Sequence, residues 1–208
     1  MTSTPEHPAQ QPPTAAGSPI APVWNLPNVL TMLRIVLVPV FVVLLWQDTT
    51  VTALIALAVF LLAAATDKLD GTIARRRGIV TNFGKIADPF ADKLLTGAAM
   101  MVLSLMGLMP WWATILILVR EIGITVLRFV MVRRSVIAAS SGGKLKTVLQ
   151  VVFLSMMMLP ATALFPAPVG DWWDIVAYVV MVLATLVTVV TGLDYCWRAW
   201  RIVREQKA

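Results

Sequence analysis

Six long apolar stretches restrict what this chain can fold into. They cover residues 29–46, 51–66, 94–109, 111–132, 145–164 and 173–197. Each is near the length of about 20 residues that a helix needs to cross a bilayer. Hydrophobic residues make up 59% of the 208 residues and charged residues only 13%, whereas soluble domains carry about 25% charged residues. The sequence therefore predicts an all-α integral membrane protein with six transmembrane helices.

Two details of these stretches give further expectations. The second and third are short for a span unless their helices continue into the polar residues 67–93 between them, and we expect that continuation. Pro39 and Pro160 lie inside the first and fifth stretches. Because proline removes a backbone N–H, we expect both residues to kink their helices.

The connections between the stretches are of two kinds. Those without any lysine or arginine are residues 47–50, the region around Pro110, and residues 165–174. Those rich in basic residues are residues 68–93, 133–146 and 198–207. Because basic connections stay in the cytoplasm, we predict that both termini are cytoplasmic and that residues 67–92 lie at the cytoplasmic boundary.

The rest of the composition excludes several kinds of site. Residues 1–24 are rich in proline, alanine, serine, threonine and glutamine, which predicts a disordered cytoplasmic tail before a membrane domain over residues 25–208. The only histidine, His7, lies in that tail, and Cys196 is the only cysteine, so we expect no zinc site and no intrachain disulfide. The net charge of +6 favours anionic lipid head groups as partners and, without a basic and aromatic soluble domain, does not favour nucleic acid.

Four aspartates stand close together in this apolar chain: Asp67, Asp70, Asp88 and Asp92. On helices, residues three or four positions apart share a face, so each pair projects from one side of its helix. Two facing helices would bring four carboxylates together, and their mutual repulsion requires a cation among them. Oxygen ligands without histidine or cysteine favour Mg²⁺, Mn²⁺ or Ca²⁺ over zinc.

The alternative is that these acids are solvated charges beside neighbouring basic side chains. Those are Lys68, Arg75, Lys85 and Lys93. Small residues argue against this alternative, because Gly71, Ala74 and Gly84 lie on the aspartate faces. Small side chains let a bulky ligand or a second backbone approach closely, which a face of salt bridges does not require.

Further ionisable residues interrupt the apolar stretches, where such a residue is by default a functional-site hypothesis. Arg34 lies in the first stretch, and Arg120, Glu121 and Arg128 lie in the fourth. Arg120 and Glu121 are adjacent and point to different sides of a helix, so we expect them not to pair with each other. For Glu121, a salt bridge to a neighbouring helix is an equally good explanation.

Four cations gather on the predicted cytoplasmic side near the fourth and fifth stretches. They are Arg120, Arg128, Lys144 and Lys146. Together they predict a pocket for an anionic second substrate. The alternative for the two arginines is a purely structural ion pair.

The frame D-x2-D-G-x2-A-R-x8-G-x3-D-x3-D runs from Asp67 to Asp92 and resembles, without departure, the signature of the CDP-alcohol phosphatidyltransferases. The resemblance implies that Asp67, Asp70 and Asp88 bind two Mg²⁺ or Mn²⁺ ions, and that Asp92 completes the metal site and acts as general base. The residues that it places around CDP-diacylglycerol are Asn28, Gly71, Ala74, Arg75 and Gly84.

Residues 25–34, 120–128 and 143–150 look like the branch of this family that makes phosphatidylglycerophosphate. That resemblance implies transfer of a phosphatidyl group from CDP-diacylglycerol to glycerol 3-phosphate, with release of CMP. It also implies a homodimer in the inner (plasma) membrane with its active site facing the cytoplasm.

Two alternatives remain open. The same chemistry with inositol phosphate or phosphatidylglycerol as acceptor fits the same motif. A cation transporter, with the aspartates as its ion path, belongs to a different class. Transport is less favoured because the acids cluster at one boundary and no internal repeat is evident.

Overall fold

The computed structural model describes residues 26–77, 82–131 and 141–205. Side chains are described within these ranges except at residues 26–28, 67–77, 82–89, 92, 128–131, 141–144 and 205. The tail predicted for residues 1–24 lies outside the described residues. Regular structure within the described ranges is helical, which confirms the all-α prediction.

The apolar stretches correspond to long helices, and one short helix follows the fifth. In chain order the helices are α1 (Leu26–Trp46), α2 (Thr50–Arg77), α3 (Asn82–Leu105), α4 (Trp111–Met131), α5 (Ser141–Met158), α6 (Ala161–Leu164) and α7 (Val169–Glu205). The continuation of the second and third stretches is confirmed, because α2 runs on to Arg77 and α3 begins at Asn82. Asp67, Asp70, Asp88 and Asp92 are therefore helical residues.

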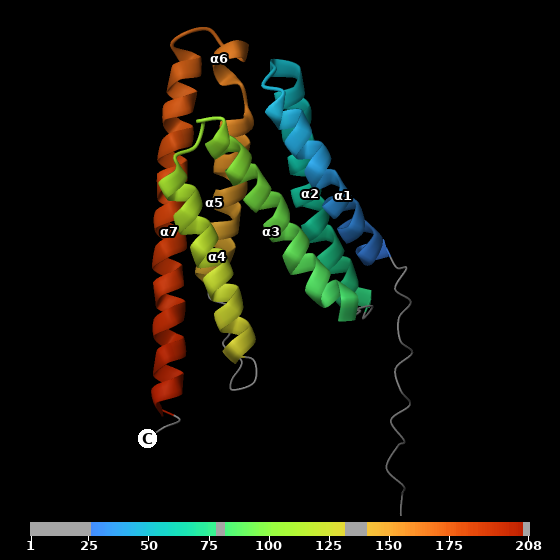
Figure 1. Ribbon diagram of the computed structural model, residues 1–208, viewed down its shortest axis with the longest axis vertical. Helices are drawn as coiled ribbons and strands as arrows, with labels where there is room; N and C mark the ends of the chain where they lie inside the picture. Colours follow the sequence, from blue (N-terminus) through green and yellow to red (C-terminus); the bar gives the residue numbers. More distant parts are fainter. Residues whose placement is uncertain (1–25, 78–81, 132–140, 206–208) are drawn as a thin grey trace, which may run out of the picture.

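Successive long helices run in opposite directions, as Figure 1 shows. The pair α1 and α2 lies on one side, and α4, α5 and α7 lie on the other. Helix α3 is inclined between them and contacts α1 and α2 as well as α4 and α5. The C-terminal ends of α2, α4 and α7 lie toward the same end of the molecule as the N-terminal ends of α1, α3 and α5.

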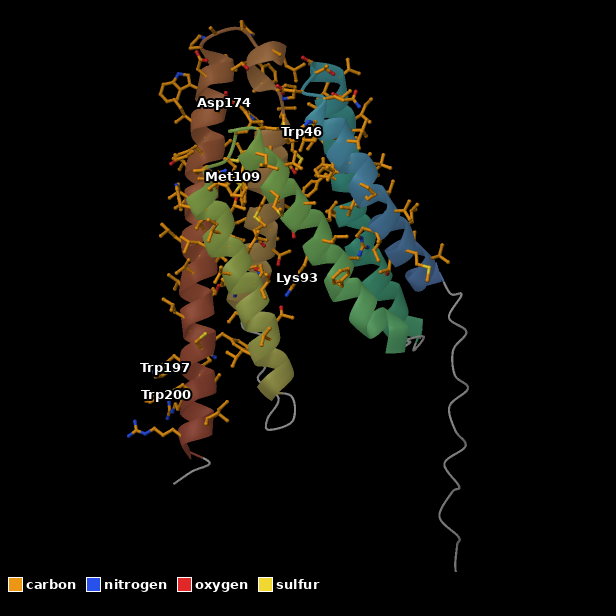
Figure 2. All side chains as sticks on the ribbon, in the orientation of Figure 1. Trp46, Lys93, Met109, Asp174, Trp197 and Trp200 are labelled. Carbon is orange, nitrogen blue, oxygen red and sulfur yellow. The ribbon has the colours of Figure 1, made fainter. Side chains whose placement is uncertain are left out.

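Within the described residues, two helices are long and apolar enough to cross a membrane by length and composition, over Val29–Trp46 and Val169–Arg204. Shorter apolar helical segments cover Thr50–Thr66, Lys93–Leu105 and Leu145–Met158. Trp46 lies near one end of the helices and Trp197 and Trp200 near the other (Figure 2), and all three indoles are exposed. Exposed tryptophan at helix ends is typical of a membrane–water interface. The number of spans and their orientation remain predictions.

The sequence led us to expect that Pro160 kinks the fifth helix. This expectation is wrong, because Pro160 follows the end of that helix. Helix α5 stops at Met158, and Pro160 is the residue before the short helix α6. A proline inside a helix removes one hydrogen bond and its ring clashes with the preceding turn. At this position the chain leaves the helix instead, whereas Pro39 stays inside α1.

The apolar core lies where α1, α2, α3, α5 and α7 meet. Phe41, Phe60, Leu103, Phe153 and Met181 are completely buried there. The rings of Phe41 and Phe60 lie with centroids 6.0 Å apart and tilted by 38°, a favourable arrangement for two aromatic rings. This packing joins α1 to α2. It thereby determines where the ends of these two helices near the aspartates lie.

A buried hydrogen bond joins the end of α3 to the beginning of α4. The hydroxyls of Ser104 and Thr114 lie 2.6 Å apart. Because each buried hydroxyl finds its partner in the other helix, neither is left unsatisfied. The contact fixes the turn between α3 and α4, and with it the part of α4 that carries Arg120 and Glu121.

Candidate active site

The two aspartate pairs lie on two consecutive helices that contact each other. Asp67 and Asp70 are in the C-terminal part of α2, and Asp88 and Asp92 are in the N-terminal part of α3. Helices α2 and α3 are in contact, and these two parts lie at the same end of the molecule (Figure 1). The side chains of the four aspartates are outside the described ones. Helical spacing within each pair is thus observed, and convergence of the pairs stays a prediction.

Arg34 reaches from α1 to α2 one turn before Asp67. Its side chain is buried, with 2% of the residue exposed. Its Nε donates a hydrogen bond to the carbonyl oxygen of Ala63, at 3.2 Å. The Thr66 hydroxyl donates to the same oxygen at 2.9 Å. Arg34 therefore brings a positive charge to the last turn of α2 before the aspartate segment.

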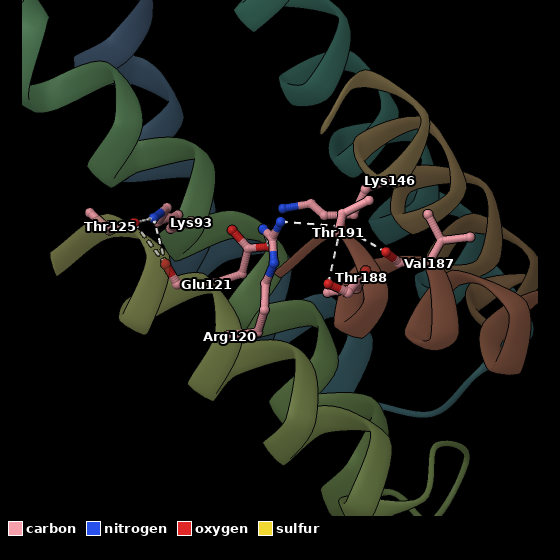
Figure 3. A network of polar contacts seen from close by, with 8 residues as sticks. All are labelled: Lys93, Arg120, Glu121, Thr125, Lys146, Val187, Thr188 and Thr191. Atoms are coloured by element: carbon pink, nitrogen blue, oxygen red, sulfur yellow. Dashed lines mark hydrogen bonds and ion pairs between the residues drawn. The ribbon is translucent and has the colours of Figure 1, made fainter. Parts of the chain in front are cut away.

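A second group of charges lies where side chains of α3, α4, α5 and α7 meet, and Figure 3 shows it at close range. Glu121 of α4 accepts from Lys146 of α5, which confirms the predicted possibility of a salt bridge to a neighbouring helix. Lys93 of α3 also reaches α4, where its Nζ donates to the Glu121 carbonyl oxygen at 3.1 Å and to the Thr125 hydroxyl. We call Lys93, Arg120 and Lys146, together with Glu121, the cationic cluster.

The expectation that Arg120 and Glu121 do not pair is wrong. Arg120 Nη1 lies 3.2 Å from Glu121 Oε1, the same oxygen that accepts from Lys146. Adjacent helical residues do point about 100° apart, but an arginine side chain is long enough to turn back. Arg120 extends across α7, where its Nη2 donates to the Thr191 hydroxyl at 3.3 Å, and its guanidinium then lies beside the carboxylate.

The cluster is largely enclosed and carries an excess of positive charge. The side chains of Arg120, Glu121 and Lys146 are 15%, 17% and 9% exposed. Two cations share one carboxylate, and Lys93 adds a third cation at the same turn of α4. Enclosed charge of one sign is costly unless an opposite charge is bound. The cluster therefore suits an anionic ligand.

Arg120 and Lys146 both retain hydrogen-bond donors for such a ligand. A guanidinium has five N–H donors and a lysine ammonium has three. Among the described residues, Glu121 and Thr191 accept from Arg120, and Glu121 accepts from Lys146. A phosphate group is an acceptor that matches this supply of charged donors.

The other two predicted cations are placed only by their helices. Arg128 lies two turns after Arg120 on α4, and Lys144 lies just before Lys146 on α5. The side chains of Arg128 and Lys144 are outside the described ones. The same holds for Asn28 on α1, and for the remaining residues of the signature motif. Those are Gly71, Ala74 and Arg75 on α2 and Gly84 on α3.

Three residues of this region were missed from the sequence. Lys93, labelled on its helix in Figure 2, directly follows Asp92 in the sequence, and this adjacency was the only available signal that it belongs to the site. Thr191 and Gly192 contact Arg120 from α7. They lie about seventy positions away from it and in an apolar stretch, and nothing in the sequence connects them with it.

Comparison with known proteins identifies the family. The family model for CDP-alcohol phosphatidyltransferase matches residues 24–190, most of the chain. The chain belongs to this family. As a CDP-alcohol phosphatidyltransferase it is a transferase of phospholipid synthesis, and the resemblance noted in the sequence is confirmed.

This phosphatidyltransferase is also similar to individual proteins over most of its length. A "Probable phosphatidylglycerophosphate synthase" of Mycobacterium tuberculosis is 46% identical over 194 residues, covering 92% of this chain and 89% of that protein. The "CDP-diacylglycerol--glycerol-3-phosphate 3-phosphatidyltransferase" of Bacillus subtilis is 35% identical, covering 87% of this chain and 98% of that protein. The protein of the same name from Rickettsia typhi is 36% identical, covering 82% and 94%.

Proposed function

We propose that this phosphatidyltransferase transfers the phosphatidyl group of CDP-diacylglycerol to glycerol 3-phosphate, giving phosphatidylglycerophosphate and CMP. Family membership and the names of its relatives support the reaction. The observation that carries the choice of acceptor is the pair Arg120 and Lys146 on one enclosed carboxylate. An acceptor that carries its own phosphate has a use for this excess positive charge.

Four carboxylates form the metal site in this proposal: Asp67, Asp70, Asp88 and Asp92. Their chemistry fits Mg²⁺ or Mn²⁺, because all donors are hard oxygen atoms and each pair stands at helical spacing on α2 or α3. Two bound ions would neutralise the diphosphate and the departing CMP. The four carboxylates would hold these ions through their oxygen atoms.

The chain's own groups then carry out the transfer. Asp92 accepts the proton of the acceptor hydroxyl. The resulting oxygen attacks the phosphorus that bears the diacylglycerol, a bond forms there, and the bond from that phosphorus to the oxygen of CMP breaks. No serine or cysteine is needed as a nucleophile, so the transfer is direct.

Binding residues place the two substrates around Asp92. The nucleotide lipid is bound by Asn28, Gly71, Ala74, Arg75 and Gly84, with Arg34 adding positive charge from α1. The acceptor phosphate is bound by Arg120, Arg128, Lys144 and Lys146. Lys93 contributes by joining α3 to α4 at Glu121, so that the base and the acceptor site lie on helices held to each other.

The proposed setting is the cytoplasmic face of the inner (plasma) membrane, with six spans, both termini in the cytoplasm and two copies in a homodimer. The basic connections support this orientation, because the helix ends that flank them lie at one end of the molecule (Figure 1). The same end carries the aspartate parts of α2 and α3. Substrate head groups and lipid phosphates meet at that depth.

CMP release by the purified protein in detergent tests the proposal. CDP-diacylglycerol and Mg²⁺ are supplied with glycerol 3-phosphate, inositol 1-phosphate or phosphatidylglycerol in parallel reactions, and a chelator is the control. Release with glycerol 3-phosphate alone supports the proposed reaction. Release with another acceptor alone contradicts the choice of acceptor while keeping the chemistry, and release that continues without a divalent ion contradicts the metal site.

A further inference from the structure

The side chain of Arg120 lies directly on a glycine of α7. A Cβ atom added at Gly192 would stand 2.8 Å from Arg120 Cγ and 3.1 Å from its Nε. Non-bonded carbon atoms pack at about 3.5 to 4.0 Å, so no side chain at this position is compatible with the observed course of Arg120. Glycine destabilises a helix interior relative to alanine. At position 192 the space left by the missing side chain is filled by the side chain of Arg120.

The residue before that glycine presents a fixed acceptor to the guanidinium. The Thr191 hydroxyl donates its proton back to its own helix, with the carbonyl oxygens of Val187 and Thr188 at 2.7 and 3.1 Å. A hydroxyl has one proton and two lone pairs. Because the proton is directed to the backbone, a lone pair remains to accept from Arg120 Nη2 at 3.3 Å.

Arg120 is thus held from two sides, as Figure 3 shows. Glu121 Oε1 accepts from Nη1, and Thr191 accepts from Nη2. Its Nε is buried and has no hydrogen-bond partner among the described residues. A buried N–H without an acceptor is unfavourable. Other contacts of the Arg120 side chain must therefore keep it in this position, and its contact with Gly192 is one of them.

We propose that Thr191 and Gly192 of α7 form a contact surface that positions Arg120 for the acceptor phosphate. We call this surface the seat of Arg120. The inference rests on the proposed function in one respect, that Arg120 binds this phosphate. Gly192 and Thr191 are positioning residues that act through Arg120 and do not touch the substrate themselves. Helix α7 then contributes to acceptor recognition without supplying a charge.

Gly192→Ala tests the seat, and Gly123→Ala is its matched control. Gly123 lies on α4 close to Arg120, but nothing stands within 4 Å of a Cβ added there. We expect Gly192→Ala to raise the KM for glycerol 3-phosphate about tenfold, as for the loss of one charge-assisted hydrogen bond. We expect kcat at saturating acceptor to change less than about twofold, and Gly123→Ala to match the native protein in both.

A double-mutant cycle shows whether the glycine acts through the arginine. In the Arg120→Ala background there is no Cγ to displace, so Gly192→Ala should have no further effect on KM. Thr191→Val keeps the shape of the side chain and removes the acceptor. It should raise KM about threefold, less than the glycine variant, again only when Arg120 is present. This second variant carries the test if Gly192→Ala does not fold.

A chemical readout separates this inference from the proposed function. Arginine modification by phenylglyoxal, followed at Arg120 by peptide mass spectrometry, should be faster in Gly192→Ala or Thr191→Val than in Gly123→Ala. If Arg120→Ala leaves the KM unchanged, the acceptor assignment fails, and faster modification alone then supports the seat. Native modification rates in both α7 variants, or KM increases of equal size with and without Arg120, overturn it.

Discussion

The aspartate parts of α2 and α3 and the cationic cluster are built in different ways. The four aspartates occur within residues 67–92, on two consecutive helices, at spacings that a helix places on one face. The cluster draws Lys93, Arg120 and Lys146 from three helices and is completed by Thr191 of a fourth. In the proposed mechanism the first group binds ions directly, whereas members of the second also hold one another in place.

This difference predicts two patterns of failure. Loss of one metal-binding carboxylate removes a ligand that no neighbour replaces, so activity should be lost almost completely. Loss of one member of the cluster leaves other cations that still attract the acceptor, so activity should decline by degrees. The variants below test that contrast, in order of expected effect.

Asp67→Ala or Asp88→Ala should reduce CMP release at least about a thousandfold. A metal site supplies several kcal/mol of charge stabilisation in the transition state, and about 4 kcal/mol corresponds to that factor. Steady-state CMP release at saturating substrates and Mg²⁺ measures it. Activity within tenfold of native in either variant would remove that residue from the metal site.

Asp92→Asn should lower kcat by about a hundredfold to ten-thousandfold, the usual contribution of a general base. The amide keeps the shape of the side chain but cannot accept the proton. Binding of CDP-diacylglycerol, measured separately, should be largely retained. Normal turnover in this variant would contradict the assignment of Asp92 as the base.

Lys146→Ala should raise the KM for glycerol 3-phosphate by about ten- to a hundredfold, with a smaller effect on kcat. The variant removes one charged donor and leaves Glu121 with Arg120 as its remaining partner. Arg204→Ala, which removes an exposed arginine near the end of α7, is the control. An unchanged KM in Lys146→Ala would exclude this lysine from the acceptor site.

Of these four kinds of variant, Glu121→Gln should have the smallest effect, an increase in the KM for glycerol 3-phosphate of about fivefold. Arg120 and Lys146 then repel each other without a shared carboxylate, but both remain present. Asp194→Asn is a matched control, because it removes the carboxylate of the exposed pair between Asp194 and Arg198, and exposed pairs contribute little. A lower KM in Glu121→Gln would mean that the carboxylate competes with the acceptor phosphate.

The difference between the aspartate segments and the cationic cluster also accounts for which expectations from the sequence were confirmed and which were wrong. Apolar length predicted the long helices. The shortness of the second and third apolar stretches predicted that α2 and α3 continue into the aspartate segments, and both expectations follow from neighbouring residues along the chain. The pairing of Arg120 with Glu121 was predicted wrongly. Angular separation on one helix does not determine where a long side chain ends when other helices surround it.

Pro160 illustrates the same limit for the backbone. The sequence placed it inside an apolar stretch, and a proline there either bends a helix or ends it. Composition cannot decide between these outcomes, because apolar residues continue on both sides. In the structure the chain leaves α5 before Pro160, and α6 packs closely against α7: a Cβ added at Gly170 would stand 2.7 Å from the Cα atom of Thr162.

The sequence by itself determined the fold class, the family and the identity of the aspartates, since these depend on composition and on spacing along one or two helices. Only the tertiary structure decided that Glu121 is shared by two cations and that Arg120 lies on Gly192 of α7. Those contacts join residues up to about seventy positions apart. In all-apolar helices no periodic polar face indicates which sides will meet, so their partners follow from packing alone.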